Sequence, residues 1–247
     1  MIKAVAFDFD HTLYDRSLTN DNMVDDYRAF FADYLKPGIS RAEVLAAIKQ
    51  ADSGSFRRKR GPTPTTKSKD AGQHWMGIYT ATLETGIFAR EPGYDLYYYG
   101  FIEKAFPKAM VLYPDTIPTL QWLREQGYVT GILTNGPSDF QRAKLEALNM
   151  YEAVDAVVLC GDLEEQKPHT MAFEAICAAM GCKTTQAVYV GDNPKNDVDG
   201  ARKAGMIPIW MRSVGVWRDE IEPARYCIDA IGEIPELLKI MKREASL

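Results

Sequence analysis

Short apolar runs alternate with helical stretches along much of the chain, and this alternation predicts a parallel α/β sheet. The first run, Ile2–Phe7, is short and ends at Asp8, which is typical of a buried strand rather than an alternating edge strand. Similar runs recur at Val129–Leu133, Val154–Leu159, Ala187–Val190 and Ile207–Met211. The helical stretches between them end at glycines: Gly127, Gly181 and Gly205. The pattern therefore predicts βαβ units that build a Rossmann-like parallel sheet with helices on both faces.

The pattern changes between Tyr14 and about Leu112, where no strand-like run occurs. This segment holds four amphipathic stretches instead: Met23–Leu35, Arg41–Ala51, Gly72–Thr85 and Pro92–Phe106. We expect a helical cap domain over residues 15–112, inserted into a sheet domain made of residues 1–14 and 113–247. The cap contains a basic segment, Arg57–Arg60, followed by Gly and Pro. This segment is either a solvated loop or a surface that attracts an anionic substrate.

Length and composition fit a globular protein that folds without covalent staples. The chain has 247 residues, of which 46% are hydrophobic, and this is enough to bury a core without disulfides or a structural metal. Its net charge of −5 argues against a partner bound through nucleic-acid phosphates. The four cysteines show no CxxC spacing, the N-terminal MIKAVAFDFD is unlike a signal peptide, and no apolar run is long enough to span a membrane. We expect a cytoplasmic monomer or homodimer without nucleic-acid or membrane partners.

Polar side chains follow the predicted strands at the edge of the sheet where α/β proteins place their sites. Asp8 and Asp10 are two residues apart, so both carboxylates face the same side, and their like charges need a cation or a proton. Later strand ends and the segments after them supply the remaining candidates: Thr134, Asn135, Gly136, Lys167, Asp192 and Asp197. Carboxylates, a hydroxyl and an ammonium together suit Mg²⁺ and phosphoryl transfer, in which a carboxylate can act as nucleophile.

Each candidate also has an ordinary structural explanation when it is taken alone. The aspartates are common in turns and helix caps, Thr134 suits a turn or an N-cap, and Lys167 before Pro168 suits a surface position. Ser138-Asp139-Phe140-Gln141 predicts a capping box at the start of a helix. Four further residues are expected to be structural or to contact substrate at most: His11, His74, His169 and Cys160. The aromatic cluster at residues 94–101 is expected to be mostly cap core.

The motifs together resemble those of the haloacid dehalogenase-like (HAD) superfamily. Asp8-Phe9-Asp10-His11-Thr12 is similar to its DxDxT motif, Thr134 to its motif II hydroxyl, and Lys167 to its motif III lysine. Residues 191–197, followed by Gly200-Ala201 and Ala204-Gly205, are similar to its acidic motif IV. The resemblance covers the whole predicted sheet domain. The insertion between the first two motifs is where one branch of the family carries a helical cap.

The resemblance implies a role for each of these residues. Asp8 is the implied nucleophile and a Mg²⁺ ligand, and Asp10 is the implied general acid/base, whose backbone carbonyl also binds the metal. Thr134 and Lys167 orient phosphoryl oxygens, with Lys167 also neutralising Asp8. Asn135 and Gly136 offer backbone amides to the phosphate. Asp192 binds Mg²⁺ directly, and Asp197 binds it directly or through water.

The expected function is therefore a Mg²⁺-dependent phosphatase that acts through an aspartyl-phosphate on Asp8. Its substrate would be a small phosphorylated metabolite, either a sugar phosphate or a nucleoside monophosphate, with the cap closing to exclude water. A phosphomutase of the β-phosphoglucomutase type uses the same groups and is the main alternative. A 2-haloacid dehalogenase needs no Mg²⁺ and lacks the second aspartate of the first motif, which is present here as Asp10. A catalytically silent binding module would not need the full set of catalytic groups.

Overall fold

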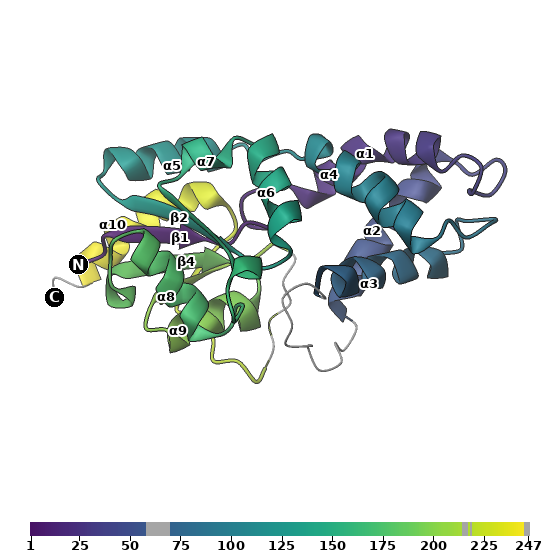
Figure 1. Cartoon of the computed structure of the whole chain (residues 1–247). Helices are drawn as coiled ribbons and strands as arrows, with labels where there is room; N and C mark the ends of the chain where they lie inside the picture. The colour runs from purple at the N-terminus through teal and green to yellow at the C-terminus, as the bar shows by residue number, and fades with distance from the viewer. Residues whose placement is uncertain (58–69, 214–216, 218, 245–247) are drawn as a thin grey trace. The chain divides into compact units, whose positions relative to one another are not determined.

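The computed structural model describes residues 1–57, 70–213, 217 and 219–244. The chain divides into two compact units, one formed by Met1–Asp15 with Leu112–Leu247 and the other by Arg16–Val111 (Figure 1). The second unit is thus a continuous segment inserted between two parts of the first. None of the described helices is both long enough and apolar enough to cross a lipid bilayer.

The first unit is built on a six-stranded sheet in which every neighbouring pair is parallel. In chain order its strands are β1 (Ala4–Phe7), β2 (Val129–Thr134), β3 (Ala156–Leu159), β4 (Ala187–Gly191), β5 (Ile207–Met211) and β6 (Tyr226–Ile228). In space the order is β3-β2-β1-β4-β5-β6. The five expected strands are present, and β6 adds a short edge strand that the sequence pattern did not indicate.

Helices cover both faces of this sheet, which confirms the predicted fold class. The helices are α5 (Thr116–Glu125), α6 (Ser138–Ala147), α7 (Met150–Ala153), α8 (Thr170–Ala179), α9 (Gly200–Lys203) and α10 (Ile234–Glu244). Figure 1 shows α5, α6 and α7 on one side of the sheet and α8 and α9 on the other. The three glycines that were expected to end helices have φ angles of 77°, 66° and 81°, in the left-handed region that glycine adopts without strain.

The core of this unit explains why its strands are apolar on both sides. Phe173 and Ile176 of α8 pack against Ala4 and Ala6 of β1 and against Tyr189 of β4, and all five side chains are buried. Four short helical segments complete the unit: η2 (Cys160–Asp162), η3 (Thr184–Gln186), η4 (Pro194–Asp199) and η5 (Ile231–Glu233). Cys160 lies within the same apolar core, as expected for a small buried residue.

The second unit is helical. Its elements are α1 (Arg16–Phe30), α2 (Arg41–Arg57), α3 (Asp70–Glu84), the π-helical segment η1 (Leu96–Ile102) and α4 (Glu103–Ala109). The helix expected over Met23–Leu35 begins at Arg16 instead, because the buried face of its first turns is polar. Arg16 is buried there and pairs with Asp52 of α2, so hydrophobic periodicity does not mark this end of the helix.

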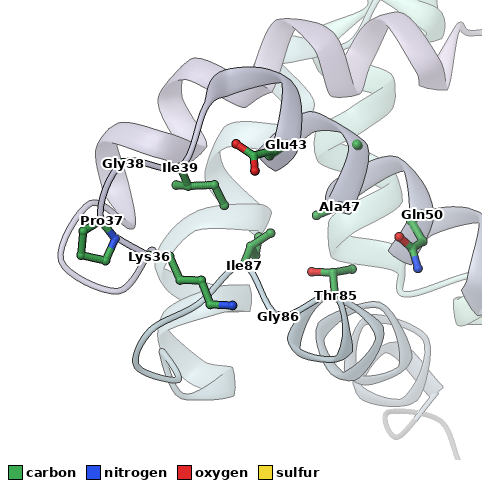
Figure 2. A pocket seen from close by; sticks show the side chains of 11 residues that line it. Lys36, Pro37, Gly38, Ile39, Glu43, Ala47, Gln50, Thr85, Gly86 and Ile87 are labelled. Atoms are coloured by element: carbon green, nitrogen blue, oxygen red, sulfur yellow. The ribbon is translucent and has the colours of Figure 1, made fainter.

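A hollow of about 460 Å³ lies within this second unit (Figure 2). Lys36, Glu43 and Gln50 contribute its polar lining, and Ile39 and Ile87 contribute apolar lining. The Glu43 carboxylate accepts hydrogen bonds from the backbone N–H and the hydroxyl of Ser40, at 2.9 and 2.6 Å. The Glu43 carboxylate therefore helps to cap the N-terminus of α2.

Candidate active site

The carboxyl ends of three central strands place the first candidate residues next to one another. Asp8 directly follows β1, Thr134 ends β2, and Asp192 directly follows β4. Strand β1 lies between β2 and β4, and the Asp8 backbone N–H donates to the Val190 carbonyl at 2.8 Å. The order of the strands reverses between β1 and β4, and this reversal is where open α/β sheets hold their ligands.

Three carboxylates converge at this point. One oxygen from each of Asp8, Asp192 and Asp197 lies within 4.8 Å of the others, and all three residues are buried. Asp197 comes from η4, and it can approach because Gly191 at the end of β4 has no side chain. A Cβ at Gly191 would lie 2.5 Å from the Cβ and the Cγ of Asp197.

Lys167 joins two of these carboxylates. Its ammonium lies 2.6 Å from an oxygen of Asp8, 2.8 Å from an oxygen of Asp197 and 2.8 Å from the Tyr189 hydroxyl. The Asn135 side chain holds the backbone of Lys167 from both sides: its oxygen accepts from the Lys167 N–H at 3.0 Å, and its nitrogen donates to the Lys167 carbonyl at 2.9 Å. The side chain of Asn135 therefore positions the lysine, in addition to the backbone role expected for this residue.

Burial and charge strongly shift the pKa values of Asp8, Asp192 and Lys167. Burial raises the pKa of Asp8 to about 7, with Lys167 opposing the rise and the neighbouring aspartates Asp197 and Asp10 adding to it. Burial also raises the pKa of Asp192 well above its usual value, and Asp197 and Asp8 raise it further. Burial lowers the pKa of Lys167, but the attraction of Asp197 and Asp8 outweighs it and raises that pKa well above its usual value.

The donor set of the cluster fits a divalent cation. Lys167 pairs with two of the three buried carboxylates, so the fully ionised cluster carries excess negative charge that a low-dielectric site tolerates poorly. Its ligand atoms are all carboxylate oxygens, which are the ligands that hard cations such as Mg²⁺ take.

Asp10 lies in different surroundings from Asp8, although only Phe9 separates them. One oxygen of its carboxylate accepts hydrogen bonds from the Tyr14 hydroxyl and the Lys144 ammonium. The other oxygen accepts from the Gln141 side-chain nitrogen at 2.8 Å. Each of the two aspartates in the first motif thus has its own buried lysine.

The expected capping box at the start of α6 is wrong. Pro137 occupies the N-cap position, no side chain caps the helix there, and the buried Ser138 hydroxyl has no hydrogen-bond partner. The Gln141 side chain turns into the site instead, where its nitrogen lies 2.6 Å from the Thr134 hydroxyl. Gly136, which connects β2 to this helix, has φ = 124°, a conformation that favours glycine.

The sequence motifs do not include three further functional candidates: Gln141, Lys144 and Tyr189. A signal for two of them exists in the sequence, because they fall with Phe140 and Leu145 on the buried face of α6, at helical spacing. A lysine and a glutamine on an otherwise apolar face need polar partners. Tyr189 carries no comparable signal, since an aromatic residue is ordinary in a buried strand.

The structure describes only some of the remaining candidates, which are the histidines, the aromatic cluster and the basic segment. His169 caps α8, because its Nδ1 accepts from the Met171 N–H at 3.4 Å. His11 is buried and has φ = 62°. Of the aromatic cluster, Tyr97 and Phe101 are buried, whereas Tyr99 is exposed. The basic segment at residues 57–60 lies, apart from the backbone of its first residue, outside the described residues, and so does the side chain of the histidine at position 74.

The fold and the site define an α/β enzyme with an acidic, lysine-containing site at the strand ends of a Rossmann-like sheet. Residues 2–205 match the family model of the haloacid dehalogenase-like hydrolases. The match spans most of the chain, so the protein belongs to this family.

The chain is also similar to three individual proteins. The glyceraldehyde 3-phosphate phosphatase of Methanopyrus kandleri is 28% identical over 95% of this chain and 99% of its own. A HAD phosphatase from Thermococcus onnurineus, whose crystal structure is known, is 28% identical, has a TM-score of 0.62, and covers 96% of this chain and 98% of its own. A 2-haloacid dehalogenase from Pseudomonas syringae matches at 24% identity and a TM-score of 0.60, covering 98% of this chain and 100% of its own. The last likeness concerns the fold alone.

Proposed function

We propose that the protein is a Mg²⁺-dependent phosphatase that hydrolyses a small phosphorylated metabolite of the sugar-phosphate class through an aspartyl-phosphate on Asp8. Its family and its phosphatase relatives make it a hydrolase of phosphoric monoesters. The metal, the covalent intermediate and the class of substrate are the new parts of the proposal. The relatives named as glyceraldehyde 3-phosphate and ribulose-1,5-bisphosphate phosphatases support a sugar phosphate as substrate.

The observation that carries the proposal is the contact between Lys167 and Asp8. The ammonium lies 2.6 Å from one carboxylate oxygen of a buried aspartate whose surroundings otherwise favour its protonated form. An ammonium at this distance favours the ionised carboxylate, which is the nucleophilic form. The same ammonium also carries positive charge to the place where a phosphoryl group would meet Asp8.

The remaining residues fit the two steps of such a reaction. In the first step an oxygen of Asp8 attacks phosphorus, the bond between phosphorus and the leaving oxygen breaks, and Asp10 donates a proton to that oxygen. In the second step Asp10 accepts a proton from a water molecule, the water oxygen attacks the same phosphorus, and the Asp8 carboxylate is restored as phosphate leaves. Lys167 and the Thr134 hydroxyl orient the phosphoryl oxygens in both steps.

Three residues would hold the metal: Asp8, Asp192 and Asp197, with the backbone carbonyl of Asp10 as a further ligand. A bound Mg²⁺ ion would supply positive charge against the negative charge of the phosphoryl oxygens. The insertion of the second unit between the first two motifs supports the prediction that this unit acts as a cap.

Phosphate release from a panel of phosphorylated metabolites, with and without Mg²⁺, tests the proposal. Asp8→Asn should abolish the release of phosphate and leave the melting temperature near that of the wild type. Asp199→Asn is the matched control: this carboxylate also lies in η4, but it pairs with Lys195 and Lys203, and the variant should keep wild-type activity. Mg²⁺-dependent turnover by the Asp8 variant would contradict the proposal, and conversion of a sugar phosphate to its isomer without phosphate release would favour a phosphomutase.

A further inference from the structure

We propose that Lys144 is a positioning residue for Asp10, which it holds in one orientation for the proton transfers of the reaction. The inference rests on the proposed function, because it assigns a role through the general acid/base of that mechanism. Lys144 lies on α6, outside the residues that match the family motifs, and pairs with Asp10.

The surroundings of Lys144 fix the position of its ammonium. Its side chain is 2% exposed, and the ammonium donates to Asp10 and, at 2.6 Å, to the Gln141 side-chain oxygen. Three aromatic rings, those of Phe9, Tyr14 and Phe140, lie with their centroids 5.3, 5.4 and 5.4 Å from the same nitrogen. Hydrogen bonds and cation–π contacts therefore hold the charge against one oxygen of Asp10.

Gln141 extends this arrangement to the second oxygen of Asp10. A lysine ammonium only donates, so the Gln141 oxygen must face Lys144 and the Gln141 nitrogen must face the site. That nitrogen lies 2.8 Å from the second Asp10 oxygen and 2.6 Å from the Thr134 hydroxyl. Donors thus contact both oxygens of the carboxylate, and one face of α6 links the proposed acid/base to the hydroxyl that would orient phosphate.

Stability alone does not account for a lysine at this position. Removing an ammonium from water costs several kcal/mol, and a buried ion pair is often no more stabilising than apolar side chains of similar volume. Positioning does account for it, because a general acid/base works only within hydrogen-bond reach of the proton that it transfers.

The proposed role separates the two steps of the reaction when p-nitrophenyl phosphate is the substrate. Nitrophenolate leaves readily without a proton, so the formation of the aspartyl-phosphate depends little on Asp10. The hydrolysis of that intermediate still needs Asp10 as a base. A change that acts through Asp10 should therefore preserve the initial burst of nitrophenolate and slow the steady state that follows.

The test is a rapid-mixing comparison of Lys144→Met, Asp10→Asn and the double variant, with Mg²⁺ and p-nitrophenyl phosphate. We expect Lys144→Met to keep the burst amplitude and to slow dephosphorylation on the order of 10- to 100-fold, part of what a general base contributes. Because phosphorylation is unaffected, KM should fall in the same proportion and kcat/KM should stay unchanged. Because Lys144 acts through Asp10, the double variant should be no slower than Asp10→Asn. Arg142→Met is the matched control: it removes a half-exposed cation from the same helix and should leave both phases unchanged.

Tyr14→Phe provides a second route if Lys144→Met fails to fold, as judged by circular dichroism. It removes another donor to the same Asp10 oxygen and keeps the ring, so it should slow dephosphorylation in the same way but less. Burst and steady state that fall in equal proportion, or additive losses in the double variant, would overturn the role of Lys144. A wild-type protein that releases no phosphate would instead overturn the proposed function itself, and an active wild type with an unaffected Lys144 variant would overturn only this inference.

Discussion

The glycine at the end of β4 offers a perturbation whose size follows from the structure. In Gly191→Ala, the new methyl group would lie 2.5 Å from the Cβ and Cγ of Asp197 and 2.6 Å from one of its oxygens. Ordinary contacts of a Cβ begin at 3.4 Å, so Asp197 would have to move by about 0.9 Å. The carboxylate is buried and bound to Lys167 at 2.8 Å and to the Asn193 N–H at 2.9 Å, so such a shift weakens both bonds.

Two losses should follow from this one methyl group. Overpacking costs about 1–3 kcal/mol of the free energy of unfolding, which lowers the melting temperature by roughly 2–12 °C in a chain of this length. Displacement of a carboxylate from the cluster should weaken Mg²⁺ binding roughly 10- to 100-fold, as disturbed support of metal ligands does elsewhere.

Calorimetric Mg²⁺ titration and thermal unfolding of Gly191→Ala measure both losses. Gly77→Ala is the control, because a Cβ at Gly77 in α3 meets no atom within 4 Å and an alanine in a helix is expected to stabilise it by about 0.5–1 kcal/mol. A Gly191→Ala protein with the wild-type melting temperature and the wild-type Mg²⁺ affinity would refute the close approach of Asp197 to the end of β4.

Three further predictions concern the buried charges. Lys167→Met should cost roughly 3–5 kcal/mol of stability in metal-free protein and remove phosphatase activity, since Asp8 loses its ammonium; chemical denaturation and a phosphate assay check this. The pKa values of Asp8, about 7, and of Asp192 are raised in the folded protein, so above about pH 4 the metal-free folded state retains protons that the unfolded state has lost. The stability of the metal-free protein should therefore fall as pH rises toward 7. The increase in melting temperature on adding Mg²⁺ should accordingly be larger at pH 8 than at pH 5, and an equal increase would contradict the assignment. In the second unit, Arg16→Met should lower the free energy of unfolding by about 3–5 kcal/mol, because the buried Asp52 carboxylate loses the guanidinium that pairs with it. Adding Asp52→Leu to the same protein should recover most of that loss, as measured by urea unfolding.

The sheet could be predicted from the sequence because its central strands are buried on both faces. Such strands consist of short apolar runs, and β1 and β4 are fully buried in the structure. Strand β6 escaped prediction because it is three residues long and lies at the edge of the sheet, where Tyr226 is only half-buried. Short edge strands depend on the strand beside them more than on their own apolar pattern.

The candidate site, too, could be predicted only in part from the sequence. Asp8, Thr134 and Asp192 lie at strand ends, so the order of the strands alone brings them together. Gln141 and Lys144 reach Asp10 from a helix, and their place depends on how α6 packs against the sheet, which local sequence does not specify. Serine followed three residues later by glutamine suited a capping box, but the buried acceptors at Asp10 and Thr134 take the Gln141 side chain instead.

The pairing of Arg16 with Asp52 in the second unit is another contact that local sequence does not specify. A buried polar face has no hydrophobic periodicity, so the start of α1 could be placed only once its partner on α2 was known. Long-range partners of this kind are a property of the tertiary structure.

The central claim, that Asp8 is the nucleophile, is tested most directly by trapping the intermediate. The protein is mixed with Mg²⁺ and a substrate that it turns over, quenched with acid and treated with borohydride, which reduces an acyl phosphate to an alcohol. Peptide mass spectrometry should then find homoserine in place of Asp8, only in the sample that received substrate, with Asp10 unmodified. Turnover that leaves Asp8 unmodified, or a modification found at another carboxylate, would contradict the account.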